Sequence, residues 1–173
     1  MRETIRVWAI STLMIFAMVW QMNTIADADA SKYLKEDLEI AVHDAAMCID
    51  YRKLAEGIII FDKKRAKQAF LDSLAANSHM KPVHASSLDM HPKPGSFFQD
   101  AFKVVTFDII DDSHPDVDGF PYSYHHPLYD MDIVYDGPTI VAVVETYGPR
   151  YFSGEKSVIR RAASYSYQFG SGE

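Results

Sequence analysis

The sequence predicts an α+β protein in which a long N-terminal transmembrane helix continues into a head with an antiparallel sheet. Three observations lead to this fold class. The chain has no charged residue from Val7 to Ala26, its apolar periodicity continues beyond that stretch, and three strand-like runs follow in the second half. The 173 residues, 48% of them hydrophobic, suffice for one membrane segment and one further domain. We therefore expect a transmembrane helix over residues 1–30 and an extracellular head over residues 31–173.

The uncharged stretch has the length of a membrane span. From Val7 to Ala26, 20 residues make about 30 Å of helix, which matches the hydrocarbon core of a bilayer. Trp8 and Trp20 are the two tryptophans of the chain, and they lie near the ends of the stretch, where aromatic rings favour the membrane interfaces. The large apolar side chains expected to contact lipid or neighbouring helices are Trp8, Ile10, Leu13, Ile15, Phe16, Val19 and Trp20.

The flanking charges predict the orientation of the span. Arg2 and Arg6 precede it, whereas Asp27 and Asp29 follow it. By the positive-inside rule, the N-terminus lies in the cytoplasm and the head lies outside the cell.

A cleaved signal peptide is the alternative interpretation of the same stretch. Ala26-Asp27-Ala28 and Ala28-Asp29-Ala30 both have the form of a cleavage site after a short basic segment and an apolar run. Against cleavage, no Gly occurs before Gly57 and no Pro before Pro82, so nothing breaks the helix ahead of these sites.

An amphipathic stripe continues the helix past the membrane. It follows steps of three and four through Tyr33, Leu34, Leu38, Ala41, Val42, Ala45, Cys48, Ile49 and Arg52. A single helix from about Thr4 to about Leu54 would be on the order of 75 Å long. The alternative is two helices with a loose joint from Ala26 to Ser31, because Asp-Ala-Asp-Ala is only a moderate helix former.

The rest of the head can be divided by its turn and capping residues. Gly57 is expected to end the long helix, and Asp62 to cap a second helix that ends near Asn77. Residues 78–100 are rich in Pro, Ser and His and predict a loop. The strand-like runs are 104–110, 139–147 and 158–168. The first alternates Val105, Phe107 and Ile109 with polar residues, and the second is apolar on both faces. The last two are expected to form a hairpin.

The charge distribution excludes one class of partner and suggests another. A net charge of -7 and a pI near 5.4 argue against nucleic-acid binding, which needs a clustered positive field. No Lys or Arg lies between Lys103 and Arg150, whereas basic residues gather from Arg52 to Lys67. The two regions are either complementary contact surfaces of neighbouring subunits or simply solvated faces.

The acidic segment "DDSHPDVDGFPYSYHHPLYDMD" holds the only candidate cation ligands. Its spacing imitates the opening of a calcium loop, but His114 stands at the first ligand position and His125 at the twelfth, where a bidentate Glu is expected. The weak candidates for a cation site are Asp112, His114, Asp116, Asp118, His125 and His126, with Asp130 as a further ligand. The alternative is a hydrated loop, and the sequence predicts no cofactor. Tyr122, Tyr124, Tyr129 and Tyr135 either form a surface for a partner or hold the segment on the sheet.

Catalysis is not predicted. The chain has no nucleophile elbow, HExxH, glycine-rich phosphate loop or CxxC motif. His43 and Asp44 are adjacent on the expected helix and should point in different directions, and the lone cysteine, Cys48, is five residues from His43. We expect a protein that is not an enzyme.

This organisation resembles a known group of proteins. An uninterrupted membrane helix running into the head, an α-rich first half and a C-terminal antiparallel sheet resemble the pilins and pseudopilins, specifically the TadE-like proteins of Flp/Tad-type pili. The stretches "LKEDLEIAVHDAAMCIDYRKLAEGIIIFDKKRAKQAF", "GFPYSY" and "GPTIVAVVETYGPRYF" are also similar to a family of membrane-anchored proteins of Gram-positive bacteria. One departure concerns processing: prepilins carry a Gly-containing site followed by Glu, whereas Glu3 here precedes the helix with no Gly near it. Processing by a prepilin peptidase is therefore not predicted.

The resemblance implies a structural subunit of, or an assembly component for, an extracellular pilus or filament. Such a subunit packs through its N-terminal helix against copies of itself or other pilin-like subunits, and is either held in the cell membrane or extracted into a surface filament. The small and flexible residues Ala9, Ser11, Thr12, Met14, Ala17 and Met18 suit close helix packing. The alternative function is a monomeric single-pass anchor whose head binds a partner or cation through the acidic Tyr/His-rich segment.

Overall fold

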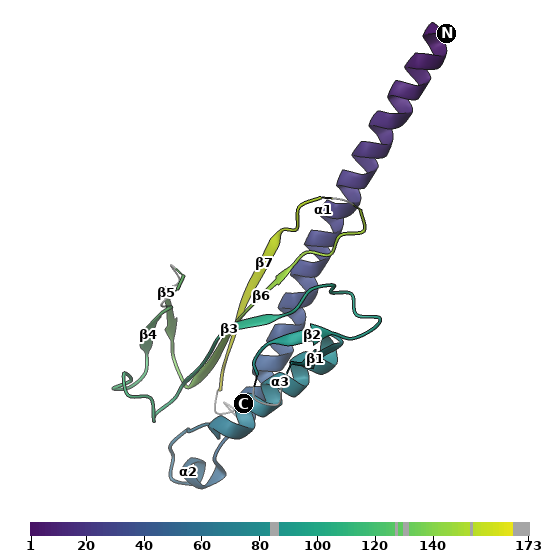
Figure 1. The fold of residues 1–173 in the computed structure, drawn as a ribbon. Coiled ribbons are helices and arrows are strands. Elements are labelled where there is room, and N and C mark those ends of the chain that lie inside the picture. Colours follow the sequence, from purple (N-terminus) through teal and green to yellow (C-terminus); the bar gives the residue numbers. More distant parts are fainter. Residues whose placement is uncertain (84–86, 127, 130–131, 153, 168–173) are drawn as a thin grey trace, which may run out of the picture.

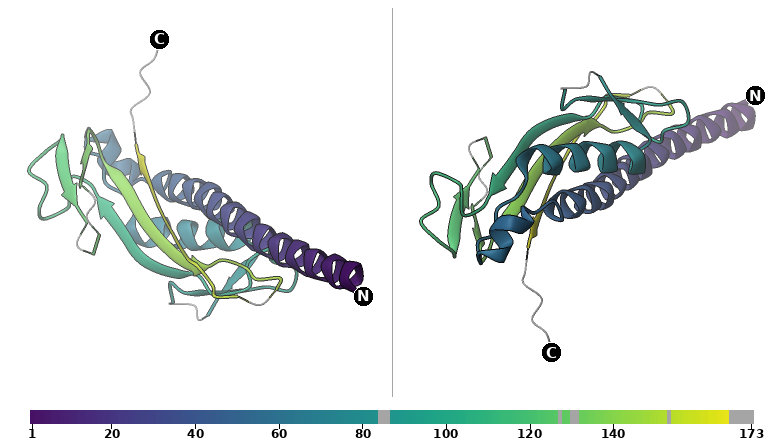
Figure 2. Two further views of the ribbon diagram at one scale, coloured as in Figure 1. Left: turned by 90° about the horizontal axis from the view of Figure 1, so that it is seen from above. Right: turned by 90° about the horizontal axis from the view of Figure 1, so that it is seen from below.

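The structure is a computed structural model that describes residues 1–83, 87–126, 128–129, 132–152 and 154–167. A long helix runs from the N-terminus through the head, and a second helix lies beside it against the same face of a three-stranded sheet (Figures 1 and 2). Two small hairpins complete the head. Asp130, one of the candidate cation ligands, and Gln168, the end of the last expected strand, lie outside the described residues.

Helix α1 (Arg2–Ala46) is one unbroken helix of 45 residues. The alternative of two helices joined at Ala26 to Ser31 is wrong, because α1 continues through these residues without interruption. Its second half carries the predicted apolar stripe into the core, with Ala26, Ala30, Leu34, Leu38, Ala41, Val42, Ala45 and Ala46 buried. α1 is therefore both the exposed N-terminal extension and the spine of the head (Figure 1).

The predicted end of the long helix near Leu54 is wrong. α1 ends at Ala46, and the chain then pairs with a distant segment: Asp50 N–H donates to Ile60 O at 2.8 Å, and Asp62 N–H donates to Cys48 O at 2.9 Å. These bonds form a bridge in which Ile49 lies opposite Phe61, and both side chains are buried. A short helix, α2 (Tyr51–Ala55), follows, and Gly57 ends that helix rather than α1, with φ 83° in the left-handed region.

Helix α3 (Lys63–Asn77) begins and ends as its sequence predicts. The Asp62 carboxylate accepts a hydrogen bond from Arg65 N–H at 3.0 Å, which caps the helix, and Ala66, Phe70, Leu71, Leu74 and Ala75 are buried. The expectation of a loop over residues 78–100 needs a correction. Strands β1 (Met80–Pro82) and β2 (Met90–Pro92) form a small antiparallel hairpin there, because Met80 and Met90 are fully buried and hold it on the core.

The main sheet has the order β3-β6-β7 and is antiparallel throughout. Its strands are β3 (Lys103–Ile110), β6 (Thr139–Tyr147) and β7 (Val158–Ser166), and the last two form the predicted hairpin. A bulge between Val104 and Thr106 shifts the expected alternation of β3. Val104 therefore faces the helices together with Phe107 and Ile109, and Val105 does not.

Strand β6 lies between two apolar clusters, which explains why it is apolar on both faces. Ile140, Ala142 and Val144 pack with α1 and α3 in the main core. Val141 packs on the opposite face under β4 (Tyr122–His125) and β5 (Asp132–Tyr135), a hairpin that forms within the acidic segment. Tyr124 and Tyr135 supply the side chains that cover Val141. These two tyrosines therefore hold the acidic segment on the sheet.

Candidate functional site

The N-terminal part of α1, residues 2–25, extends beyond the head, and we call it the stem (Figure 1). α1 is long and apolar enough to cross a membrane, and none of its most apolar 18-residue window is buried within the structure. Six of the seven predicted contact residues, Trp8, Ile10, Leu13, Ile15, Phe16 and Trp20, are exposed, while Val19 is partly covered. A continuous surface of large apolar side chains of this kind marks a membrane or protein contact.

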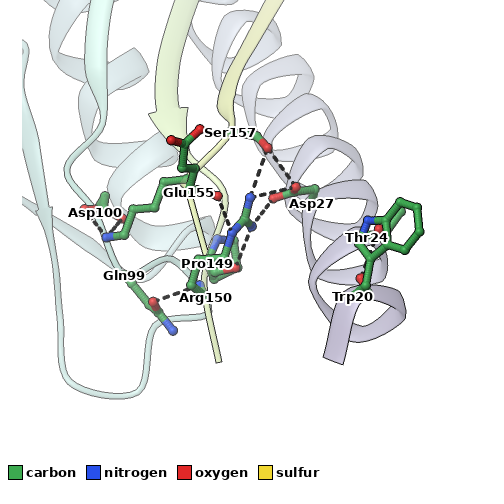
Figure 3. A network of polar contacts seen from close by, with 10 residues as sticks. Trp20, Thr24, Asp27, Gln99, Asp100, Pro149, Arg150, Glu155 and Ser157 are labelled. Carbon is green, nitrogen blue, oxygen red and sulfur yellow. Dashed lines mark hydrogen bonds and ion pairs between the residues drawn. The ribbon is translucent and has the colours of Figure 1, made fainter. Parts of the chain in front are cut away.

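Just beyond the stem, where α1 enters the head, an ion pair joins α1 to the connection between β6 and β7. Arg150 follows β6, and its guanidinium donates to the two carboxylate oxygens of Asp27 at 2.5 and 3.0 Å (Figure 3). Ser157, which precedes β7, donates to Asp27 at 2.9 Å and accepts from Arg150 at 3.0 Å. The side chain of Arg150 is only 9% exposed. We call Asp27, Arg150 and Ser157 the junction.

The remaining donors of Arg150 are also used within the junction region. Its Nε donates to Glu155 O at 2.8 Å, and Nη1 also donates to Pro149 O at 3.0 Å. Its backbone N–H donates to the side chain of Gln99 at 3.1 Å (Figure 3). Because a guanidinium has a planar fork of donors, this geometry cannot be reproduced by lysine. The junction holds the β6–β7 connection in one position on α1.

Gly148 allows the connection to come this close to the helix. A Cβ atom at this position would overlap the carboxylate of Asp27, lying 3.0 Å from its Cγ and closer still to Oδ1. Farther along the sheet, Arg161 of β7 donates to the side chain and the backbone carbonyl of Ser31. The β6–β7 hairpin is thus fastened to α1 at two successive levels. On the N-terminal side of the junction, Trp20, Asn23, Arg150 and Gly154 border an open hollow of about 370 Å³.

The candidate cation ligands of the acidic segment that the structure describes do not lie together. Asp112 accepts a hydrogen bond from Ile59 N–H at 3.1 Å, and exposed His125 contacts Asp132 at 2.6 Å. His126 is fully buried and contacts Thr106 at 2.7 Å. The other candidates, His114, Asp116 and Asp118, lie in the turn before β4. Within the described residues, no three His, Cys, Asp or Glu side chains lie together as metal ligands would.

Two acidic residues instead hold a neighbouring segment in place, which sequence reasoning missed. Asp111 is fully buried and accepts from Phe61 N–H at 3.0 Å and from Ser113. Asp112 accepts from Ile59 N–H in the same way. These carboxylates therefore satisfy backbone donors of the strand-like segment before α3. The two acceptors are about 50 residues from their donors, so no local pattern could have indicated the pairing.

The His43, Asp44 and Cys48 cluster shows one departure from expectation. His43 Nδ1 lies 3.4 Å from Asp44 Oδ1, so these side chains do not point apart, although the contact is exposed and long. Cys48 Sγ contacts Asp44 O at 3.7 Å, and burial raises the pKa of its thiol. A raised pKa disfavours the thiolate, which is the nucleophilic form.

Glu145 of β6 is held as an ion by its neighbours. Tyr129 donates to its carboxylate at 2.8 Å, and Arg160 of β7 both pairs with it and stacks over the Tyr129 ring at 4.0 Å. The Tyr129 hydrogen bond and the charge of Arg160 lower the pKa of Glu145 despite the opposing effect of burial. The deprotonated form is therefore favoured in the folded head.

We expect this shift to appear as acid sensitivity. Below the ordinary value of 4.5, the unfolded chain binds a proton at Glu145 that the folded head resists, so the free energy of unfolding falls as the pH drops through the folded pKa. Glu145→Gln should flatten this part of the pH dependence. Denaturant unfolding between about pH 3 and 6, a range that includes the ordinary pKa of a Glu carboxyl, measures it. Glu36→Gln, which removes an exposed helical carboxylate, is the matched control. Identical pH profiles for the parent and Glu145→Gln would contradict the assignment.

The ion pair and hydrogen bonds that fasten the β6–β7 connection to α1 thus lie where the stem meets the head. The stem presents apolar side chains to its surroundings, and just beyond the stem the junction ties α1 to the connection between β6 and β7. Comparisons of the chain with protein-family models, with curated proteins and with solved structures found no match.

Proposed function

We propose that the protein is a structural subunit of, or an assembly component for, an extracellular pilus or filament, and that it packs through its stem. The observation that carries the proposal is that a single 45-residue helix is an exposed apolar stem in one half and the buried spine of the head in the other. A flexible tether would suffice for a simple membrane anchor. A helix that continues rigidly into the core fits a subunit whose head must keep a defined position relative to its neighbours.

The proposal includes a pilin-like, TadE-like head outside the cell, with the N-terminus in the cytoplasm before extraction. Copies of the chain or other pilin-like subunits are the partners. An apolar stem leaves lipid only if an equally apolar surface receives it, and small side chains at Ala9, Ser11 and Ala17 let helix backbones approach. The stems would then form the apolar core of the assembly.

The contacts of the junction support retention of the stem in the mature protein. Cleavage after Ala28 or Ala30 would remove Asp27, the partner of largely buried Arg150. Either cut would also remove buried Ala26 from the core. Signal-peptide removal would therefore leave an uncompensated cation and a gap in the head.

Intact mass of the protein recovered from sheared surface material, and separately from washed membranes, tests the proposal. Chain that retains residues 7–26 in the sheared fraction supports assembly through the stem. Full-length chain confined to membranes excludes the filament subunit and leaves an assembly component or the monomeric anchor whose acidic segment binds a partner. A mass that begins at Asp29 or Ser31 identifies a cleaved signal peptide and overturns the filament proposal.

A pair of stem variants separates packing from anchoring. Replacing Ala9, Ser11 and Ala17 together by Leu keeps the stem apolar but blocks close approach of a second helix. We expect this variant to stay in the membrane and to be lost from sheared material. Met14→Leu with Met18→Leu, which exchanges one large apolar side chain for another, is the matched control. Equal recovery of both variants in the sheared fraction would contradict packing through the stem.

A further inference from the structure

The end of the β6–β7 hairpin carries a cluster of exposed apolar side chains. Tyr147 and Val158 are cross-strand partners at the last pair of the hairpin, and Tyr151 and Phe152 lie in the connection between them. All four are exposed, and they are four of the eleven exposed large apolar side chains described beyond Ser31. We call them the apolar tip. Exposed apolar side chains that lie near one another mark a surface that contacts a protein or a membrane.

The junction places the apolar tip beside the stem. Arg150 on one side of Tyr151 and Phe152 binds Asp27, and on the other side a Cβ atom at Gly154 would lie 3.5 Å from Asn23. In Figure 1 the β6–β7 connection is the part of the head that lies nearest the N-terminal end of α1. The apolar tip is thus held close to the level of α1 at which Trp20 is exposed.

Two of the three charged side chains of the connection are paired, and the third, Glu155, is exposed. Arg150 is paired with Asp27, and Lys156 donates to Asp100 at 2.7 and 2.9 Å. Apart from Glu155, the outward side chains named at this level are aromatic: Tyr151, Phe152 and, on α1, Trp20, which is 77% exposed. Amphipathic aromatic rings with little net charge are the composition of protein surfaces at the headgroup level of a bilayer.

We propose that the apolar tip and Trp20 form one membrane-contact surface, through which the head docks on the interfacial region of the bilayer. The inference rests on the stem being a membrane span, as in the proposed function, but not on assembly into a filament. The junction is then the device that fixes how far the head stands from the lipid.

Docking at this level shortens the span. The polar junction cannot enter the hydrocarbon, so the bilayer surface lies near Trp20 rather than at Ala26. From Val7 to Trp20 there are 14 residues, about 21 Å of helix against the roughly 30 Å of a typical hydrocarbon core. Such a mismatch is relieved by bilayer thinning, by snorkelling of a flanking residue such as Arg6, or by association of helices. The docked head therefore favours association of stems.

Tryptophan emission in vesicles tests the docking. The full chain with Trp8→Phe and Trp20→Phe contains no tryptophan and accepts a single probe. Phe152→Trp places the probe in the apolar tip, and Tyr151→Trp repeats the measurement from its neighbour. Tyr51→Trp is the matched control, an exposed aromatic position on α2 at the opposite end of the head (Figure 1). The vesicles contain phosphatidylcholine and phosphatidylglycerol, with or without bromine near the headgroup end of the acyl chains.

We expect brominated lipid to quench most of the emission of the Phe152→Trp and Tyr151→Trp chains and to leave Tyr51→Trp unchanged. The chain with only Trp20→Phe reports on the span through Trp8. If Trp8 is quenched while both tip probes are as insensitive as Tyr51→Trp, the docking proposal is overturned and the span stands. If Trp8 is not quenched either, the span and the docking fall together. Neither outcome depends on filament recovery, which separates this proposal from the assembly proposal.

Discussion

Arg150→Leu is expected to lower the free energy of unfolding of the head by about 2–3 kcal/mol, because it leaves the Asp27 carboxylate without its partner. The side chain of Arg150 is 9% exposed and that of Asp27 is 26% exposed, so solvent cannot replace the lost contacts fully. The connection between β6 and β7 should also detach from α1. Denaturant unfolding of the full chain in detergent micelles measures the first effect, and hydrogen exchange of residues 148–152 measures the second.

A neighbouring ion pair provides the matched control for the junction. Lys156 lies six residues after Arg150 and pairs with Asp100, and its side chain is 41% exposed. Lys156→Leu removes this cation. Exposed pairs contribute about 0–1 kcal/mol, so this variant should be nearly as stable as the parent. Arg150→Lys should lose most of the stability that Arg150→Leu loses, since lysine cannot make the bidentate contact. Equal effects of Arg150→Leu and Lys156→Leu would contradict a special role for the junction.

Phe70→Ala is expected to lower the free energy of unfolding by about 3–5 kcal/mol. Phe70 is fully buried on α3, and its ring packs against Phe107 of β3 with centroids 4.8 Å apart. Removing the ring leaves a cavity between the helix layer and the sheet, which the surrounding side chains cannot fill without moving. The same micelle-based denaturant unfolding measures the loss.

Two further Phe variants calibrate the result. Phe70→Leu retains much of the apolar volume and should cost less than Phe70→Ala. Phe152→Ala removes the same ring from an exposed position and should change stability by no more than about 0.5 kcal/mol. A small loss for Phe70→Ala, comparable with that for Phe152→Ala, would show that the interface between α3 and the sheet is not the core of the head.

The helices and strands that could be predicted are those with a complete local signal. α3 has an Asp cap, an apolar stripe and a clear end, and β6 is a continuous apolar run bounded by turns. The end of α1 has no such signal. Its stripe runs on through Ile49, and the helix stops only because the backbone around Ile49 pairs with the segment around Phe61.

The candidate site was predicted in one part and missed in the other. The stem is visible as an uncharged stretch with a tryptophan near each end, because the composition that suits a membrane span is a local property of the chain. The bulge in β3 was missed. The hairpin of β4 and β5 was also missed, since it depends on how the acidic segment folds back over the sheet. This folding also separates two of the candidate cation ligands. Asp112 accepts a hydrogen bond from the backbone of Ile59, and His126 is buried beside Thr106.

The sequence by itself determined the apolar stem, the stripe that makes α1 the spine of the head, and the strands that pair as the last hairpin. These features follow from residue spacing and composition over neighbouring turns, which are local properties of the chain. Only the tertiary structure decided that Arg150 binds Asp27, that Asp111 supports Phe61, and that the β6–β7 connection approaches α1 at Asn23. Asp27 and Arg150 are 123 residues apart, and their pairing depends on the packing of β6 and β7 against α1, which brings two ordinary surface-type charges into one largely buried contact.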